Sequence, residues 1–465
     1  MSFMNNDLNS NQISEKPSHT WFHPSRWLYR YSVLFIVSLL TFGSYFAYDS
    51  VGAIAPTLIK ALGIGRESIG QMYTLYSVAA ILSVFIGGML IDRIGTRRAS
   101  LLFSLLVTVG AFIVAVAPNI WILYFGRFIF GWGSESLVVA QSAIFTRWFK
   151  GKELAFAFGV GLTISRLGTL FSFNTEALIA EYFRHYSAAL WAAVLFCCLS
   201  LLANALYIML DRRGERELKL QEEGGGDKIV LADVKKFRSS YWYVTLLCLT
   251  FYSAIFPFTA LSTDFFNSKW GLPLTVGSEG GFFTQVFYNV IHMFSTAGGT
   301  TTIIIFASMI LAPVFGQLLD RFGRRATIMV GGSILMVPAF LTMAFTMIPP
   351  AFPMIVLGAA FVMVPAAMWP SIPLLVEKNR IGTAFGLTTM IQNFGLALFP
   401  WLNGLLRDAT QSYTASMVMF SMLGIIGLVF ALLLLRADKR EGGKLEKVDR
   451  NAPASGGDSE VVTNN

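Results

Sequence analysis

Charged residues are scarce in this chain. Asp, Glu, Lys and Arg make up 13% of its 465 residues, against 55% hydrophobic residues, and the mean hydropathy is +0.61. Soluble domains carry about 25% charged residues, so this composition excludes an ordinary soluble domain and predicts a protein that resides in a lipid bilayer. The net charge of +8 implies no nucleic-acid partner, because most basic residues fall in short loops between apolar runs.

Side chains for covalent or metal chemistry are also few. The three cysteines, Cys197, Cys198 and Cys248, lie inside apolar runs, which is typical of small buried residues rather than of a disulfide or metal framework. The sequence shows no nucleophile with a base and no His/Cys/Asp grouping at ligand spacing, and its four histidines suggest no proton relay. We therefore expect neither an enzyme nor a bound cofactor.

Two processing signals are absent from the sequence. No Asn-x-Ser/Thr sequon occurs, and the polar stretch 1–25 lacks the basic and apolar segments of a secretory signal. We expect a prokaryotic protein of the bacterial inner (plasma) membrane with a cytoplasmic N-terminal tail.

Long apolar runs divide the chain into two similar parts. A helix needs about 20 apolar residues to cross the hydrocarbon, and six such runs precede Asp211 while six follow Ser240. We predict an all-α membrane protein with twelve transmembrane helices in two six-helix halves. The predicted spans are 31–58, 69–91, 99–117, 120–146, 154–180, 188–210, 241–266, 300–319, 326–347, 352–376, 382–406 and 413–435.

The segments between these runs complete the predicted organisation. We divide the chain into a cytoplasmic N-terminal tail (1–30), an N-terminal bundle (31–210), a cytoplasmic linker (211–240), a C-terminal bundle (241–435) and a cytoplasmic C-terminal tail (436–465). The linker is charged and glycine-rich, as expected of a solvated connection. The loop 267–299 is the longest, and its apolar residues at helical spacing predict either an interfacial helix or an early start of the eighth helix.

The basic residues predict an orientation. With both termini in the cytoplasm, the inner loops contain Arg93, Arg97, Arg98, Arg147, Lys150, Lys152, Arg321, Arg324, Arg325, Lys378 and Arg380, and the outer loops contain only Lys60, Arg66, Arg184, Lys269 and Arg407. The excess of positive charge on the inner side favours this orientation.

A short motif occurs twice. Gly88-Met-Leu-Ile-Asp92-Arg93-Ile-Gly95-Thr-Arg97-Arg98 recurs as Gly316-Gln-Leu-Leu-Asp320-Arg321-Phe-Gly323-Arg-Arg325, each after the second helix of its half. The repeat predicts two matched halves that expose a central site alternately to each side. Both copies resemble the G-x-x-x-D-R-x-G-x-R-R loop of the major facilitator superfamily, and Arg127-x-x-x-Gly131-x-Gly133 resembles that superfamily's R-x-x-x-G-x-G element.

That resemblance implies a conformational latch. Asp92 and Asp320 are predicted at cytoplasmic helix ends, where they could pair with basic groups and hold the outward-open state; the alternative is that the charges only anchor a turn among the headgroups. The candidate latch residues are Asp92, Arg93, Arg97, Asp320, Arg321, Arg325 and Arg127.

Two ionisable residues lie deep within apolar runs. Glu135 falls about halfway along the fourth predicted helix and Arg166 about halfway along the fifth, so at 1.5 Å rise per residue both are about 20 Å from the helix ends. Charges at this depth are costly and indicate function. They could pair and hold the two helices together, or they could bind a zwitterion, the carboxylate taking an ammonium and the guanidinium a carboxylate.

The surrounding motifs resemble one family within the superfamily. They are Phe42-Gly-Ser-Tyr45-Phe-Ala-Tyr48-Asp49, Gly131-Trp-Gly-Ser-Glu135-Ser-Leu-Val-Val-Ala-Gln141, Trp148-Phe-Lys-Gly-Lys-Glu153-Leu, Ser165-Arg166-Leu-Gly168 and Ile391-Gln392-Asn393-Phe-Gly395-Leu-Ala. They are similar to the family of major facilitator superfamily domain-containing protein 1, a lysosomal dipeptide transporter in animals. The resemblance implies dipeptide transport, with the matching Glu and Arg holding the two termini of the peptide.

Further residues are weaker candidates for substrate contact. Tyr45 and Tyr48 share a face of the first helix and could instead be core packing. Trp369, between two prolines, could be a gate or a pocket wall. Gln392, Asn393 and Asn174 could contact a peptide or make interhelical hydrogen bonds.

Several questions stay open at this stage. The substrate could be another small solute, such as an organic anion or a proton-exchanged drug, and a receptor with a transporter fold is a further alternative. Transport could be uniport or could be linked to protons through Glu135. We expect a monomer whose partners are a small-molecule substrate, the lipid bilayer and possible protons, with no nucleic acid.

Overall fold

The computed structural model describes residues 23–24, 26–149, 153–218, 236–277, 280–377 and 380–447. The described part is helical and contains no strand. The predicted tails and the centre of the predicted linker lie largely outside the described residues.

The helices follow the apolar runs of the sequence. Their bounds are α1 Trp27–Ala53, α2 Ala55–Leu62, α3 Arg66–Val116, α4 Ile120–Phe149, α5 Leu154–Tyr182, α6 Tyr186–Leu218, α7 Ser239–Trp270, α8 Phe282–Ile291, the 3-10 turn η2 Met293–Ser295, α9 Ala297–Phe322, α10 Arg325–Phe345, α11 Ala351–Leu375, α12 Ile381–Thr410 and α13 Thr414–Arg440.

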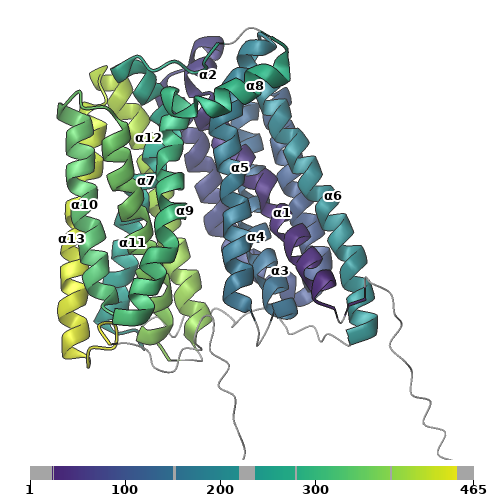
Figure 1. Cartoon of the computed structure of the whole chain (residues 1–465), viewed down its shortest axis with the longest axis vertical. Helices are drawn as coiled ribbons and strands as arrows, with labels where there is room; N and C mark the ends of the chain where they lie inside the picture. The colour runs from purple at the N-terminus through teal and green to yellow at the C-terminus, as the bar shows by residue number, and fades with distance from the viewer. Residues whose placement is uncertain are drawn as a thin grey trace, which may run out of the picture.

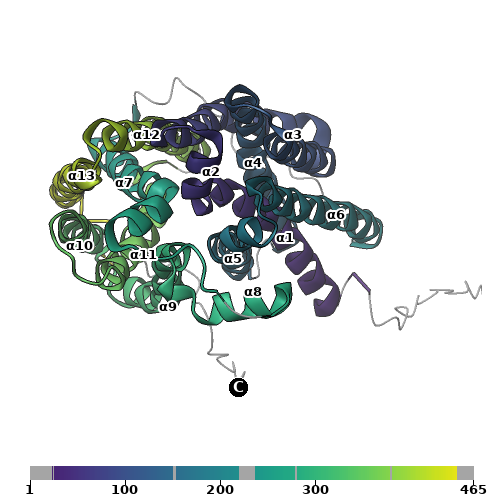
Figure 2. The same cartoon turned by 90° about the horizontal axis from the view of Figure 1, so that it is seen from above.

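The helices gather into two bundles that stand side by side (Figure 1). The N bundle contains α1–α6 and the C bundle α7–α13, and the view along the helices shows them facing each other (Figure 2). We call the side on which α1 begins and α13 ends the terminal side, and the other side the distal side. The chain crosses between these two sides repeatedly, as expected of a membrane transporter built from two halves.

The bounds of the observed helices differ from those of the predicted spans in three places. The first predicted span is divided at Ile54 into α1 and the short α2, and α3 joins the second and third spans across Gly95, whose φ of 79° is not helical. A residue without a Cβ adopts this conformation readily. In addition, α6 continues to Leu218, so Asp211, the predicted start of the linker, lies within a helix.

Ten helices of the described part are long and apolar enough to cross a membrane. The first and the last helix, α1 and α13, are among them. The predicted number of twelve spans stays a prediction, because α3 contributes a single candidate span, Ile86–Val116, and α12 is not one of the ten.

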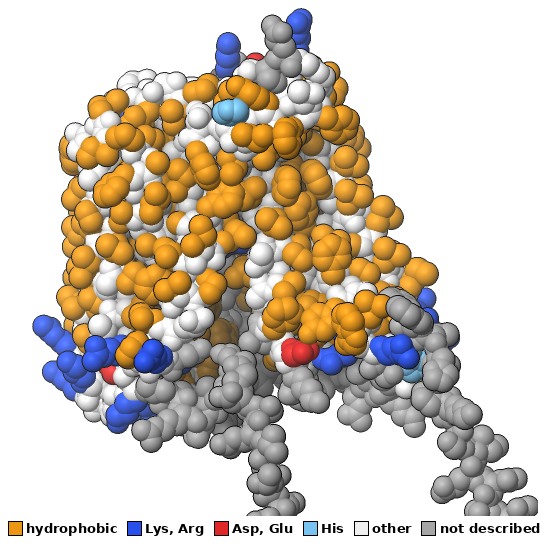
Figure 3. Space-filling model, in the orientation of Figure 1, with side chains coloured by type: hydrophobic (Ala, Val, Ile, Leu, Met, Phe, Trp, Pro, Cys, Tyr) orange, Lys and Arg blue, Asp and Glu red, His pale blue; other side chains and the backbone are white. Residues whose placement is uncertain are grey.

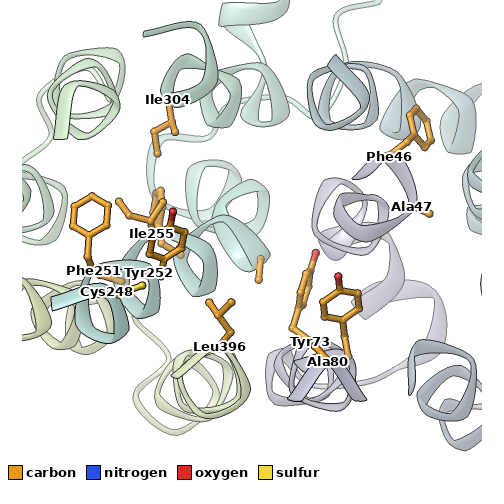
Figure 4. Packing of buried hydrophobic residues seen from close by; sticks show 14 of the residues in the cluster. Phe46, Ala47, Tyr73, Ala80, Cys248, Phe251, Tyr252, Ile255, Ile304 and Leu396 are labelled. Atoms are coloured by element: carbon orange, nitrogen blue, oxygen red, sulfur yellow. The ribbon is translucent and has the colours of Figure 1, made fainter. Parts of the chain in front are cut away.

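The apolar surface matches a bilayer environment. Hydrophobic side chains cover the waist of the molecule, and Lys and Arg side chains gather at its terminal end (Figure 3). Inside, buried apolar side chains of both bundles belong to one cluster: Phe46, Tyr73 and Ala80 lie in the N bundle, and Phe251 and Tyr252 lie in the C bundle (Figure 4). Large apolar side chains on the outside are stable only where lipid replaces water.

Glycine brings the bundles together on the distal side. A Cβ on Gly404 of α12 would collide with the backbone of Arg66 and Glu67 on α3, and one on Gly70 of α3 would collide with the backbone of Pro400. Small residues allow helix backbones in membranes to approach this closely. The α3–α12 contact is therefore the tight seam between the bundles.

Candidate functional site

Arg166 lies at the meeting point of the two bundles. Its guanidinium carbon is 5.6 Å from the ring centre of Tyr45 on α1, 5.6 Å from that of Phe256 on α7 and 5.3 Å from that of Phe361 on α11. The side chain is half-buried and forms no hydrogen bond or ion pair with any described residue. Ring faces attract a cation, yet they leave all five N–H donors of the guanidinium available for an anion.

An aromatic wall continues from this point into the C bundle. The ring of Phe256 stacks on Tyr252 at 5.5 Å and meets Phe361 at 5.9 Å. Trp369 donates a hydrogen bond from Nε1 to the Tyr252 hydroxyl at 2.9 Å, and it stacks on Phe385 at 6.0 Å. Trp369 thus lies in the wall that faces Arg166, as a pocket residue would.

Glu135 lies on α4 of the N bundle and is half-buried. One of its oxygens, Oε1, accepts a hydrogen bond of 2.8 Å from the hydroxyl of Tyr76, which in turn lies 3.0 Å from Ser134 Oγ. No second hydrogen bond or ion pair joins Glu135 to another described residue. The carboxylate is therefore oriented by one neighbour and keeps acceptor capacity for a donor.

Glu135 and Arg166 do not pair with each other. Both residues are described, and the ion pairs among described residues do not include them. The interpretation that they merely hold α4 and α5 together is contradicted in this conformation. The two residues lie on α4 and α5, and both are half-buried.

The two tyrosines of α1 have different surroundings. Tyr45 borders Arg166, whereas Tyr48 packs edge-on against Tyr73 and Tyr76 at 5.1 and 4.7 Å. Because Tyr76 also binds Glu135, Tyr48 is linked to the acidic residue and Tyr45 to the basic one.

The two polar candidates on α12, Gln392 and Asn393, use only part of their hydrogen-bonding capacity within the protein. The amide oxygen of Gln392 accepts a weak hydrogen bond from Cys248 Sγ at 3.6 Å. Asn393 is buried and donates to Thr389 of its own helix, but its Oδ1 has no partner. The Gln392 bond joins α12 to α7, as the structural alternative predicted, whereas Asn393 makes no hydrogen bond to another helix.

Asn174 lies in the contact between the bundles on the distal side, not beside Arg166. Its backbone oxygen accepts a hydrogen bond of 2.6 Å from Asn289 of α8, and its Nδ2 lies 3.4 Å from Thr302 of α9. Its Oδ1 is buried and has no hydrogen-bond partner, so its predicted contact with a substrate stays a prediction.

A charged network that the sequence did not single out closes the distal side. Arg66 of α3 binds Asp264 of α7 at 2.8 Å and approaches Asp408 of α12 at 3.8 Å. Asp408 accepts from the backbone N–H of Glu67 at 2.9 Å, and the Tyr413 hydroxyl donates to Asp264 at 2.6 Å. We call these residues the distal network.

All hydrogen bonds and ion pairs between described residues of the two bundles lie on this side. Besides the distal network they include Trp401 to Glu67, Thr74 to Ala397, Thr263 to Gly52 and Thr275 to Glu181. Toward the terminal side the space-filling surface shows a hollow between the bundles (Figure 3). Among the described residues, the polar contacts that join the bundles are therefore on the distal side.

The predicted latch residues on the terminal side do not join the bundles here. Asp92, Arg93 and Arg321 are exposed, and Arg321 lies over the ring of its neighbour Phe322. The side chain of Asp320 lies outside the described part. A latch would join the bundles only when the terminal side is closed. The predicted latch role of these residues therefore stays a prediction.

Arg97 of the first motif is instead bound within the N bundle. It contacts Asp211 at 2.5 Å and also pairs with Glu215, both on α6. Asp211 is fully buried and accepts two further bonds, from Arg147 at 2.9 Å and from Trp148 Nε1 at 2.8 Å. The other motif arginine, Arg325, has an Nη1 without a hydrogen-bond partner.

Arg127 lies in the distal third of α4, far from the terminal-side motifs, so we remove it from the latch. Its guanidinium is buried among the rings of Tyr48, Tyr73 and Tyr76 and donates to the backbone oxygen of Ala47 at 3.2 Å. It holds α1, α3 and α4 together.

No three His, Cys, Asp or Glu side chains of the described residues group as metal ligands would. The candidate site thus combines the Arg166 guanidinium, the Glu135 carboxylate and an aromatic wall. Such a set can bind a small charged or zwitterionic organic molecule.

The comparison with known proteins identifies the class. The sequence model of the Major Facilitator Superfamily matches residues 37–293 and 281–464. This chain belongs to the major facilitator superfamily and is a multi-pass membrane transporter, not an enzyme.

Its relatives within that superfamily are more specific. The chain is 31% identical over 436 residues to the lysosomal dipeptide transporter MFSD1 of Homo sapiens, covering 91% of this chain and 89% of the relative. It is 32% identical over 433 residues to the protein of that name from Danio rerio, covering 90% of each. These matches confirm the resemblance that the motifs predicted.

A solved structure has the same fold. A bacterial homologue of the human lysosomal transporter Spinster, in an inward-facing and unoccupied conformation, superimposes with a TM-score of 0.68 at 13% identity, covering 90% of this chain and 99% of that one. At this identity the likeness shows the fold alone.

Proposed function

We propose that the chain transports small zwitterionic peptides, chiefly dipeptides, by alternating access. Glu135 binds the ammonium group of the peptide and Arg166 binds its carboxylate. The observation that carries this proposal is the position of Arg166, which reaches aromatic rings on both bundles and forms no salt bridge with a described carboxylate, although the buried Asp49 interacts with it electrostatically. A carboxylate of the substrate would satisfy it through a two-pronged contact.

The cost of burying charge supports a binding role for both residues. A guanidinium and a carboxylate within a membrane protein are expensive unless they are paired or used. Here they are not paired with each other, and each keeps free hydrogen-bonding capacity. A zwitterion neutralises both at once, whereas a free anion or cation neutralises only one.

A second candidate function is transport of an organic anion. It is favoured by the fact that Arg166 contacts the C bundle while Glu135 is bonded to Tyr76 within the N bundle. An anion would use Arg166 and leave Glu135 with its tyrosine. The two candidates differ in whether a free ammonium group on the substrate is required.

Binding of defined ligands separates these candidates. We expect dipeptides with free ends to raise the melting temperature of the detergent-purified protein, because a ligand that binds the native state stabilises it by mass action. Dipeptides with a blocked amino end should lose this effect. Equal stabilisation by amino-blocked dipeptides or simple carboxylates would contradict the zwitterion site and favour the anion.

Uptake into proteoliposomes then tests the two residues. Glu135→Gln and Arg166→Ala should each abolish dipeptide uptake while the protein stays folded. Glu377→Gln and Arg98→Ala are matched controls, since both residues are exposed loop or helix-end residues outside the site. Uptake at the wild-type rate by either folded site variant would refute the assignment. Uptake with and without a pH gradient decides between uniport and proton-linked transport.

We further propose that the terminal side faces the cytoplasm of a bacterial cell, with two bundles of six spans and the chain acting as a monomer. The band of Lys and Arg at the terminal end supports this orientation (Figure 3). Labelling of a single cysteine in place of Arg98 by a membrane-impermeant maleimide tests it: intact cells should protect the position and broken cells expose it.

A further inference from the structure

The short helix α8 lies apart from the spanning helices. It is an independent ten-residue helix in the segment between α7 and α9, neither a start of α9 nor part of α7. It lies near the distal ends of the helices and roughly across their axes (Figure 1). Seen along the helices, it is at the edge of the molecule beside α5 and α9, where the two bundles meet (Figure 2).

One side of α8 is bound to the protein. Asn289 is its only buried residue; its Nδ2 donates to the backbone oxygen of Asn174 on α5 at 2.6 Å, and its Oδ1 accepts from the backbone N–H of Val276 at 2.9 Å. Phe282 packs against Tyr182 at the end of α5, at 5.1 Å between ring centres. A helix that follows α7 in the chain is thus fastened to the N bundle.

Another side of α8 is apolar and exposed. The exposed fractions are 84% for Phe283, 68% for Phe287 and 58% for Ile291, and Phe294 just beyond the helix is 51% exposed. The first three are spaced by four residues and so form one stripe along the helix. The sequence of α8 contains no Asp, Glu, Lys or Arg.

The stripe continues the surface that faces lipid. Tyr182 and Phe183 at the distal end of α5 are 43% and 59% exposed, and Ile310 on the outward face of α9 is 70% exposed. Apolar side chains over this region join those of the spanning helices below (Figure 3). Aromatic residues are enriched at the boundary between headgroups and acyl chains, which is the depth of these helix ends.

We propose that α8 is a membrane-interface helix whose stripe of Phe283, Phe287 and Ile291 binds the headgroup–acyl boundary of the distal leaflet while Asn289 straps the segment to α5. The lipid is the occupant because the stripe is uncharged, lies in the plane of the leaflet and is continuous with the lipid-facing surface. In this conformation the strap joins the segment after α7 to the N bundle. The proposal does not depend on which solute is carried.

Spin labels in lipid bilayers test the proposal directly. In the full chain with Cys197, Cys198 and Cys248 replaced by alanine, a label at Phe287→Cys should collide more often with dissolved oxygen than with a water-soluble nickel chelate. Ile310→Cys provides the hydrocarbon reference and Lys60→Cys, an exposed residue of α2, the water reference. Thr284→Cys, exposed on α8 but off the stripe, should be more accessible to nickel than Phe287.

Each outcome decides the proposal. A depth at Phe287 and Phe283 between the two references, with Thr284 nearer water, supports the interface helix. Nickel accessibility at Phe287 equal to that at Lys60 overturns it in favour of a solvated helix. Shielding of Phe287 from both reagents overturns it in favour of a protein partner or a second copy of the chain. Two independent label positions on the stripe guard against misfolding of one variant.

Discussion

Tyr76 determines where the Glu135 carboxylate points. Its hydroxyl donates to one carboxylate oxygen at 2.8 Å, and Tyr48 packs against its ring at 4.7 Å. The other oxygen is left for a ligand. A hydrogen bond that already orients a charged side chain reduces the conformational entropy lost when a ligand binds.

Removing that donor should weaken substrate binding without abolishing transport. We predict that Tyr76→Phe raises the KM for dipeptide uptake about tenfold, because a hydrogen bond to a charged group contributes about 1.5–3 kcal/mol and about 1.4 kcal/mol corresponds to a factor of ten. Initial uptake rates over a range of substrate concentrations measure the change.

A tyrosine elsewhere in the core provides the comparison. Tyr243→Phe on α7 alters a half-buried ring away from Glu135 and should leave the KM unchanged. A Tyr76→Phe protein with wild-type KM would show that the hydroxyl does not orient the binding carboxylate.

Asp211 is a residue of stability rather than transport. It is fully buried and bound to Arg97, to the nearly buried Arg147 and to Trp148. Removing one partner of a buried ion pair leaves the other charge without compensation and costs about 3–5 kcal/mol. We predict that Asp211→Ala lowers the melting temperature of the purified protein strongly.

The neighbouring acid on α6 is the matched control. Glu215 also pairs with Arg97, but its side chain is 40% exposed, and an exposed pair contributes at most about 1 kcal/mol. Glu215→Ala should therefore shift the melting temperature only slightly. Similar losses in the two variants would mean that burial does not determine the effect.

The sequence identified some of these residues and not others, for a physical reason. Glu135 and Arg166 stand out because a charge within a long apolar run is rare and costly. Tyr76 and Asp211 do not stand out, since a tyrosine and a helix-end acid are ordinary until the fold brings their partners to them. The contacts of Asn174 with α8 and α9 were not predictable, because helical spacing gives the face of a residue but not the bundle opposite that face.

At the scale of elements, the seam between α3 and α12 controls closure of the distal side. The backbones meet at Gly404 and Gly70, where any side chain would collide with the opposing helix. The bundles can approach this closely only because both positions lack a Cβ.

A larger residue in the seam should hold the distal side open. We predict that Gly404→Val increases the distance between spin labels placed on the distal ends of the two bundles and lowers dipeptide uptake. The physical reason is that the valine would overlap the backbone of Arg66 and Glu67, which cannot move away without separating the bundles.

The control substitution tests the effect of valine on a helix alone. Gly159 lies within α5, and a Cβ there would meet no atom within 4 Å. Gly159→Val should leave the label distances unchanged. An unchanged distance in Gly404→Val would instead mean that the seam is not the contact that seals the distal side.

The elements themselves were largely predictable from apolar runs. Runs of about 20 apolar residues mark most spans because lipid admits few other backbone structures. The breaks were not predictable in the same way: Gly95 and Ile54 interrupt helices within sequences that stay apolar or motif-like. The independence of α8 also required the fold, since its spacing suits an interfacial helix and an extension of α9 equally well.

At the scale of the whole molecule, the polar contacts between the two bundles that involve only described residues are on the distal side. Arg66, Asp264 and Asp408 of the distal network tie α3 to α7 and α12. These contacts exist only when the distal side is closed. Their strength therefore contributes to the balance between the two orientations of the carrier.

Exchange of the charges tests this contribution. We predict that Arg66→Asp shifts the population toward the distally open state, because three carboxylates would then face one another, and that adding Asp264→Arg restores the closed state in part. Distances between spin labels across the distal side, measured in lipid, report the populations.

The double variant is the decisive comparison. Restoration by Asp264→Arg requires that the two side chains act on each other rather than on stability in general. If the double variant is as open as Arg66→Asp alone, the pair does not control the seal. The repeated motif at Asp92 predicted two matched halves, but it gave no information on this network, whose members are single residues far apart in the chain.

The aromatic partners of Arg166 have a consequence for how the carrier resets. A carrier gives net flow only if its unloaded form can return across the membrane; otherwise it is restricted to swapping one solute for another. Tyr45, Phe256 and Phe361 offer their ring faces to the guanidinium from both bundles, so the cation is partly compensated without cargo. We therefore predict that the unloaded carrier returns readily, so that net dipeptide uptake does not require a second solute moving in the opposite direction.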